Sequence, residues 1–550
     1  MPHKRSDYMH RLSDLKVERS SFIFHAKELS ENIEPRRGRF FISDRNKGNK
    51  RHTKIINSRA TQAHRTAQSG IFAGIMSPTR PWFKLETLDP DLMNSADVKA
   101  WLYNVEQLIR TIFLESNLYN MAPVMLGELL LFGTGAMSHV DDFENVSRFY
   151  THTFGSYYIA QNDRFVVDTF ALEHELQIKQ IIADFGKENV SDFVRNHWDK
   201  GNYYVWAPVV QFIESNPDVD TRKEGAEFKP FKSVWFEPGN INREQFLRKS
   251  GFDEFPIHIS RWALAGEDIY GTNSPGMIAL GDVKSLQTLE KRKAQAIDKL
   301  VNPPLKGPPS LRDVPINALP GGVTVFDADG TKEGLTTLYQ VDPRLAEMSA
   351  DIQGIEARIN EAFFVDLFLA ISAMRGVQPR NQLELSQRNE ERLLMLGPPL
   401  QRLQLELLSM IINRTFAQAV RAGILPPPPS ALQGQNLGIR YISALAQAQR
   451  AVEVATIERS AIFAGELAAV NPEVLDRFDA DEALKQFAQM TGAVPSIIKS
   501  DEEVEQIRQQ RAEQEQAALE AQIQQQQAGA AQSGTQAIKN LSDAGDQGGN

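Results

Sequence analysis

The chain has 550 residues, of which 42% are hydrophobic and 24% are charged, and this ordinary globular composition excludes bulk disorder. It contains no cysteine, which excludes disulfides, thiolate metal sites and catalytic thiols. The formal net charge of −10 argues against tight binding of nucleic acid, which depends on Lys and Arg, but it does not exclude weak contact with DNA.

Helices are predicted for much of the N-terminal part, which lacks the apolar segment of a secretory signal. The pattern is amphipathic with a helical period from Ser6 to about Glu34, and a polar, basic loop follows. The next expected elements are a helix from about Lys54 to Met76, a strand at Trp82, a helix near Ala96 to Asn117, and an apolar helix to Phe132.

One face of the helix predicted at 54–76 carries almost no side chains. Its small residues recur at steps of three and four, at Ala60, Ala63, Ala67, Gly70 and Gly74. Polar residues elsewhere on the helix argue against a membrane location, so the bare face is expected to let another element of the body pack closely.

The most apolar part of the chain, from Met121 to Met137, contains Glu128 and three glycines and is too short to span a bilayer. It is expected to be a buried core helix. Short aromatic and β-branched runs follow between Ala136 and Pro256, including SYYIAQ, RFVVDTF, YYVWAPVV and KSVWFE. They predict strands, so the first half of the chain is expected to be α+β.

A pair of long helices is predicted in the middle of the chain. The first begins at Ser274 and ends before Pro303, with an apolar stripe of Val283, Leu286, Leu289, Ile297 and Leu300. The second begins after Asp342-Pro343, with a stripe of Leu345, Met348, Ile352, Ile355, Ile359 and Phe363.

About 40 residues, from Pro303 to Val341, separate these helices, which is too long for a tight hairpin. PPLKGPPSLRDVP is expected to be loop, whereas GGVTVFDADG and GLTTLYQV each predict a strand. A small module at the tip of a two-helix stalk is therefore expected.

A basic loop, ISAMRGVQPRNQ, leads into a long helix that is expected to bend or break at Gly397-Pro398-Pro399. After the spacer Pro426 to Pro429, the region from Gln447 to Met490 is predicted to be helical. The last fifty or so residues are rich in Gln and Ala, first helix-capable and then expected to be disordered.

Motifs for chemistry are weak throughout. GxxxxGK[ST] is absent, and Gly133-Thr-Gly135 lacks the third glycine of a dinucleotide fingerprint. Ser274 is followed by proline and suits a helix start better than a nucleophile elbow. The ten histidines show neither HExxH nor i, i+4 pairs. No catalytic residue, metal site or cofactor is predicted.

The basic clusters allow two interpretations. Lys291-Arg292-Lys293 lies on a predicted helix beside Glu290 and is more typical of a solvated face. Arg375 and Arg380 flank Gly376 and Pro379 in a loop, where they could project charge into a lumen or close a turn. The pattern does not decide between these two possibilities.

Three separated stretches resemble the signature blocks of the portal, or head-to-tail connector, proteins of short-tailed bacteriophages. They are RATQAHRTAQSGIFAGIMSPTRPWFKL, YGTNSPGMIALGDVKSLQTLEKRKAQAIDKLVNPP and QRNEERLLMLGPPLQRLQLELLSMIINRTF, in the order found in that family. The similarity covers roughly residues 6 to 425, and the remaining C-terminal residues match in character only.

The resemblance implies an α+β, predominantly helical portal fold. Its expected parts are an α/β wing at 1–276, a stem helix at 277–301, a small α/β clip at 302–342, a second stem helix at 343–370, a tunnel loop at 371–381, a bent wing helix at 382–429, a helical crown at 430–505 and a partly disordered Gln/Ala-rich tail at 506–550.

The resemblance also implies a function. A ring of about twelve subunits would form at one capsid vertex, as the channel for packaging and ejecting double-stranded DNA. Its expected partners are the terminase large subunit, tail adaptor or nozzle proteins, and capsid and scaffolding proteins, without a membrane. The protein would reside in the virion, and in the host cytoplasm during assembly.

Site residues are expected in two places. Met374, Arg375, Gln378 and Arg380 would line the DNA channel in the tunnel loop, and Lys306, Arg312, Asp327 and Lys332 would dock partners in the clip. Two alternatives stay open: another virion structural protein, such as a tail adaptor or internal scaffold, and a metal-dependent DNA-processing enzyme of the phage. For the enzyme, nothing in the spacing of the carboxylates favours a nuclease site.

Overall fold

In the computed structural model the chain forms two compact units, Met1–Gln449 and Arg450–Asn550. The structure describes residues 4–40, 54–89, 92–220, 222–223, 225–240, 244–307, 336–337, 344–373, 396–432, 434, 437–443, 445, 457, 460–468, 473, 477–491, 504–514 and 516–517.

Helices make up most of the described elements. In the first unit they are α1 (Arg5–Asn32), α2 (Arg59–Ile75), α3 (Ala96–Glu115), α4 (Leu118–Phe132), α5 (Ile178–Phe185), α6 (Asp192–Asp199), α7 (Pro275–Val301), α8 (Leu345–Ala362), α9 (Val365–Ala373) and α11 (Ser409–Arg421), with short helical turns η1 (Leu92–Asn94), η2 (Ala226–Phe228), η4 (Gln404–Leu408) and η5 (Ser430–Leu432). The second unit contains α13 (Ala480–Thr491).

The strands that the structure describes belong to the first unit. They are β1 (Phe83–Thr87), β2 (Thr134–Asp142), β3 (Val146–His152), β4 (Tyr157–Gln161), β5 (Val167–Gln177), β6 (Trp206–Ser215), β7 (Phe231–Phe236), β8 (Arg248–Phe252), β9 (Ile257–Arg261), β10 (Leu305–Lys306), β11 (Thr336–Thr337) and β12 (Leu437–Tyr441). All the pairings are antiparallel, in sheets of order β4-β5-β6-β7-β8, β3-β2-β9, β1-β12 and β10-β11. The α+β, predominantly helical class is confirmed.

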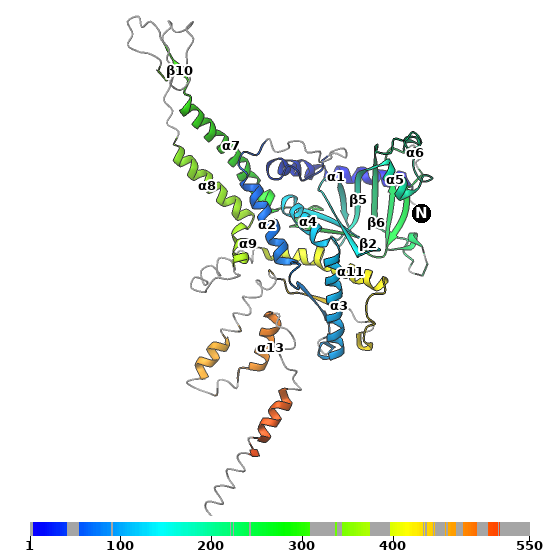
Figure 1. The fold of residues 1–550 in the computed structure, drawn as a ribbon, viewed down its shortest axis with the longest axis vertical. Helices are drawn as coiled ribbons and strands as arrows, with labels where there is room; N and C mark the ends of the chain where they lie inside the picture. Colours follow the sequence, from blue (N-terminus) through cyan, green and yellow to red (C-terminus); the bar gives the residue numbers. More distant parts are fainter. Residues whose placement is uncertain are drawn as a thin grey trace, which may run out of the picture. The chain divides into compact units, whose positions relative to one another are not determined.

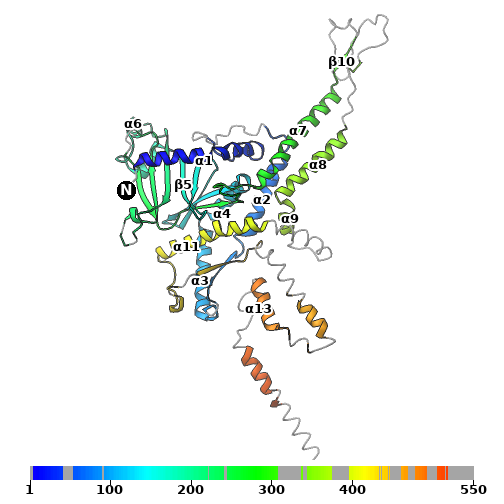
Figure 2. The same ribbon diagram turned by 180° about the vertical axis from the view of Figure 1, so that it is seen from behind.

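Helix α1 lies across one face of the five-stranded sheet (Figures 1 and 2). Tyr8, Leu12 and Leu15, spaced at helical intervals, pack with Val210 and Phe212 of β6. Alternate residues of the same strand point to the opposite face, where they meet α5 and α6. The body is therefore layered, with helices on both faces of this sheet.

The small face of α2 is a close-packing seam, as predicted. Ala60, Ala63 and Ala67 are at most 2% exposed, and the helix packs against α4, α8 and α9. A Cβ added at Gly70 would lie 2.3 Å from Cγ of Phe368 in α9. The seam therefore joins the body to the base of α8 and α9, because larger side chains would hold these helices apart.

Several boundaries differ from the predictions. The apolar run at 121–137 is helical only to Phe132, where the apolar helix was predicted to end, because Gly133 adopts a left-handed conformation (φ 75°); the rest of the run opens β2 at Thr134. The expected second stem helix is divided into α8 and α9 around Phe364, whose φ is 53°. Apolar periodicity continues across that break, so the pattern did not reveal it. Helix α9 also takes in residues 371–373, which were expected to begin the tunnel loop.

The tip and the region after Pro429 also differ. Leu305–Lys306, expected to be loop, forms β10 and pairs with Thr336–Thr337 of β11, which lies in the predicted GLTTLYQV strand. GGVTVFDADG lies outside the described residues. The helical crown was expected to begin at residue 430. This prediction is wrong for Leu437–Tyr441, which form strand β12 and pair with β1. Residues 396–403 are helical through Pro398 and Pro399, and the described irregularity is the π-helical turn η4.

Candidate functional site

Helices α7 and α8 pack side by side into a stalk that projects from the body (Figure 1). Ser274 caps α7 by accepting a hydrogen bond from Met277 N at 3.3 Å, and Pro275 occupies the first turn. The end of α7 near the body is buried, whereas no residue of α7 beyond Gln287 is buried. Leu300 and Val301 in the far half are 45% and 71% exposed.

A short segment before α2 ties the two stalk helices to the body. Gln287 of α7 accepts hydrogen bonds from Ile56 N (2.6 Å) and Asn57 N (2.9 Å), and it donates to Asn57 O (2.9 Å). Asn57 Nδ2 in turn donates to Glu290 Oε1 of α7 and Glu356 Oε1 of α8, each at 2.9 Å. Both helices are thus fixed by one side chain.

Cations collect on another side of the stalk. A hollow of about 550 Å³ is lined there by residues of both helices, including Lys284, Leu289, Arg292, Ile355 and Arg358. Arg358 binds Asp282 with Nε and Nη2 at 3.0 and 2.8 Å from Oδ1, and Lys284 binds Glu28 of α1. The lining thus holds two apolar side chains and three cations, together with the carboxylate of Asp351.

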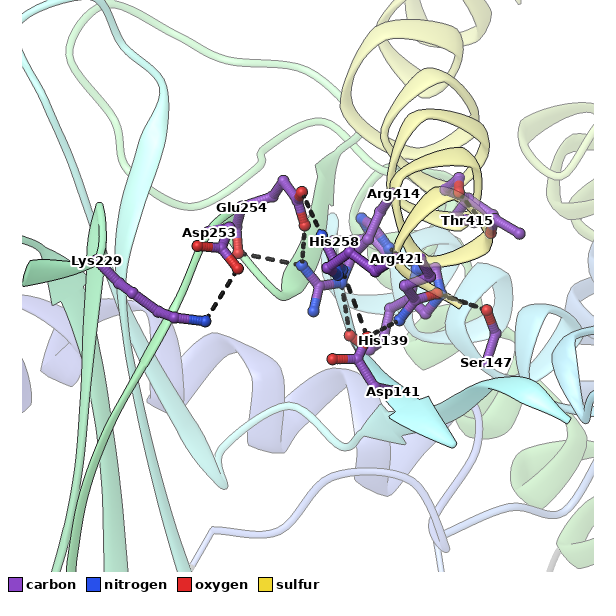
Figure 3. Close-up of polar contacts among 12 residues, drawn as sticks. His139, Asp141, Ser147, Lys229, Asp253, Glu254, His258, Arg414, Thr415 and Arg421 are labelled. Carbon is purple, nitrogen blue, oxygen red and sulfur yellow. Dashed lines mark hydrogen bonds and ion pairs between the residues drawn. The ribbon is translucent and has the colours of Figure 1, made fainter. Parts of the chain in front are cut away.

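A buried polar network joins α11 to the body (Figure 3). His139 Nδ1 lies 3.0 Å from His258 Nε2, and His139 Nε2 lies 3.1 Å from Ser147 Oγ. The Ser147 hydroxyl donates to Gln418 Oε1 of α11 at 2.5 Å. These contacts are all satisfied when both imidazoles are neutral and each carries its proton on Nε2.

Burial governs the ionisation of this histidine pair. Burial and the nearby Arg414 lower the pKa of His258 to about 3. Burial, with His258 and Arg414, lowers the pKa of His139 well below its ordinary value. Arg414 donates from Nε to His139 O (2.8 Å) and from Nη1 to Glu254 Oε2 (2.9 Å). Charge is therefore carried by arginine and carboxylate, while the histidines serve as neutral packing groups.

The sequence did not reveal this network. His139 and His258 are 119 positions apart, and their pairing depends on β2 lying beside β9. Within the described ranges, no group of three or more His, Asp or Glu side chains is placed to hold a metal ion.

The predicted site residues divide into two groups. Lys306 lies in β10 and is exposed, opposite Thr336 in the register. The other predicted clip residues, Arg312, Asp327 and Lys332, lie outside the described residues. So do all four predicted channel residues, which are Met374, Arg375, Gln378 and Arg380.

Comparison with known proteins bears on the whole chain. The model of the family "Bacteriophage head to tail connecting protein" matches residues 5–498. The portal protein of Salmonella phage epsilon15 is 43% identical over 510 residues, which are 92% of this chain and 91% of that protein. The probable portal protein of Bordetella phage BPP-1 is 42% identical over 519 residues, 94% of this chain and 93% of that protein.

Solved structures offer a more distant likeness. A chain from the neck of an empty GTA particle is similar with a TM-score of 0.37 and 13% identity, over 78% of this chain and 92% of that one. A similarity at this level supports no conclusion about function. Among the helices that the structure describes, none combines the length and the apolar character needed to cross a bilayer.

The resemblance drawn from three short stretches of sequence is confirmed, since the match to the family model takes in all three and the two portal relatives are more than 40% identical to this chain over the aligned residues. The chain belongs to the family of bacteriophage head-to-tail connecting proteins.

Proposed function

We propose that this protein is the subunit of a phage portal. Copies of the chain form a closed ring, of about twelve subunits as the family resemblance implies, at one vertex of the capsid. Double-stranded DNA enters the head and leaves it through the centre of the ring. The role is structural, and the ATP-driven motor is a separate protein, the terminase.

The observation that carries this proposal is the exposed far half of the stalk. Beyond Gln287 the apolar stripe of α7 continues through Ile297 and Leu300, which are 42% and 45% exposed. Of the elements that the structure describes, one subunit places only α7 and α8 in the stalk, too few to bury the stripe. Identical stalks standing side by side in a ring would cover it.

Three regions would then carry separate tasks. The segment 374–381, which follows α9, contacts DNA through Arg375 and Arg380, with Met374 and Gln378 shaping the constriction. The tip of the stalk, including Lys306, Arg312, Asp327 and Lys332, binds the terminase large subunit during packaging and the tail adaptor afterwards. The body contacts capsid and scaffolding proteins during assembly in the host cytoplasm, and the ring remains in the virion.

Labelling intact particles with an antibody against this chain tests the location. The label is expected at one vertex of each particle, where the tail joins the head. Label on all vertices, or along the tail alone, would contradict the portal proposal and favour another virion protein.

The loop assignment has its own test, in which Arg375 and Arg380 are both replaced by Ala. Particles assembled with this variant are expected to package or retain less DNA, because transient phosphate contacts in the channel are lost. The matched control replaces Lys291, an exposed cation of the stalk, by Ala. Equal DNA content in both variants would remove Arg375 and Arg380 from the channel.

A further inference from the structure

Each stalk helix carries a glutamate two positions before an arginine: Glu290 and Arg292 in α7, and Glu356 and Arg358 in α8. Successive residues of an α-helix are rotated by about 100°, so residues two apart point about 200° from each other. In both helices the glutamate and the arginine therefore lie on nearly opposite sides.

The contacts show that the like charges of the two helices share a side. Glu290 and Glu356 both accept a hydrogen bond from Asn57 Nδ2, which places their carboxylates together. Arg292 and Arg358 line the same hollow, together with Lys284. We call Glu290 and Glu356 the glutamate flank of the stalk. We call Lys284, Arg292 and Arg358 the arginine flank.

Each flank retains bonding capacity inside the subunit. In the described part of the chain, Arg292 has neither a hydrogen bond nor an ion pair, whereas Arg358 and Lys284 bind Asp282 and Glu28. Glu290 and Glu356 each use one oxygen for Asn57, and among the described residues no cation pairs with them. The hydrogen bonds from Asn57 orient both carboxylates. Because both glutamates are only half-buried, they remain accessible to a neighbouring molecule.

We propose that the arginine flank of one subunit receives the glutamate flank of the neighbouring copy. This inference rests on the proposed ring. In a closed ring each subunit presents opposite sides to its two neighbours, which is the arrangement of charge seen here. A two-fold contact would instead bring like flanks together and be repulsive. Charge complementarity therefore sets the direction of assembly, while burial of the apolar stripe supplies most of the affinity.

Two charge reversals test the contact. R292E places a carboxylate at the unpaired position of the arginine flank, and E290R places a guanidinium in the glutamate flank. In either variant alone, residues 290 and 292 of neighbouring subunits then carry the same charge, so each is expected to form rings roughly tenfold less than the wild type. An equal mixture is expected to restore rings that contain the two variants in equal numbers, because residue 292 of one variant then meets a residue 290 of opposite charge in the other. Native mass measurement reads out this composition.

A double variant and a matched control complete the design. The chain carrying both E290R and R292E has its charges exchanged, and it is expected to form rings with itself. K291E is the matched control, because it also reverses one charge on α7. The side chain of residue 291 points about 100° away from both Glu290 and Arg292, so it lies on neither flank. This variant is expected to assemble as the wild type does. Recovery in the mixture also shows that both single variants are folded.

The outcomes separate this inference from the portal proposal. Wild-type rings with unaffected single variants would overturn the flank contact and leave the ring intact. Loss of rings in R292E that neither the mixture nor the double variant reverses would also overturn it. Absence of rings in the wild type would contradict the proposed function itself.

Discussion

The neutral histidine pair gives the body a defined response to acid. The pKa of His258 falls from its ordinary value of 6.5 to about 3 in the folded chain, so between these values the unfolded state binds the extra proton. The stabilising contribution is present above about pH 6.5 and is lost as the pH falls. We expect the free energy of unfolding to decrease from pH 6.5 towards pH 4, and less steeply in His258→Gln. Denaturant titrations across this range measure it, and equal slopes would contradict the assignment.

Glu106 of α3 has the opposite dependence. It accepts a hydrogen bond from Leu85 N at 2.6 Å, and burial raises its pKa to about 7. A raised pKa favours the protonated form in the fold, so stability is lost as the pH rises from about 4.5 through 7. Glu106→Gln is expected to be at least as stable as the wild type at pH 8, because the amide oxygen can still accept the bond.

The matched change Glu106→Ala leaves Leu85 N without this acceptor, and is expected to cost about 1–3 kcal/mol. Thermal unfolding of the two variants at pH 8 compares these effects. Equal destabilisation by Gln and Ala would show that the bond to Leu85 is not the reason for the buried carboxyl group.

Among the elements, α2 depends most on the absence of side chains. Gly70→Ala is expected to destabilise the body by about 1–3 kcal/mol, because the new Cβ would lie 2.3 Å from Cγ of Phe368. The matched control is Gly354→Ala in α8, where a Cβ would meet nothing within 4 Å. This substitution is expected to stabilise the folded subunit by up to about 1 kcal/mol, because alanine favours the helix more than glycine does. Denaturation of the unassembled subunit measures both changes, and equal effects would contradict the seam.

The sequence predicted elements whose cause is local. The periodicity of α1, the apolar stripe of α7 and the small face of α2 reflect neighbours one helical turn apart, and all three are present in the structure. The β1-β12 pair and the contact of His139 with His258 join distant positions, so no local pattern marks them. The break at Phe364 was missed because the residues on either side keep the same apolar spacing.

At the scale of the whole molecule, the stalk links sequence to assembly. Leu300→Ser changes a side chain that is 45% exposed in one subunit, so the stability of the unassembled chain is expected to change by less than about 0.5 kcal/mol. Ring formation is expected to weaken markedly, since the far part of the stripe would be buried between subunits of the proposed ring. The control is Phe143, which is fully exposed in the turn between β2 and β3. Phe143→Ser is expected to leave assembly unchanged. Equal assembly of the Leu300 variant and the wild type would contradict this role of the stripe.

The ring is the central claim, and electron microscopy of the purified chain combined with native mass measurement tests it most directly. We predict closed rings of a single subunit number, with a central hole wide enough for double-stranded DNA. A chain that remains a monomer or dimer under all assembly conditions would contradict the account.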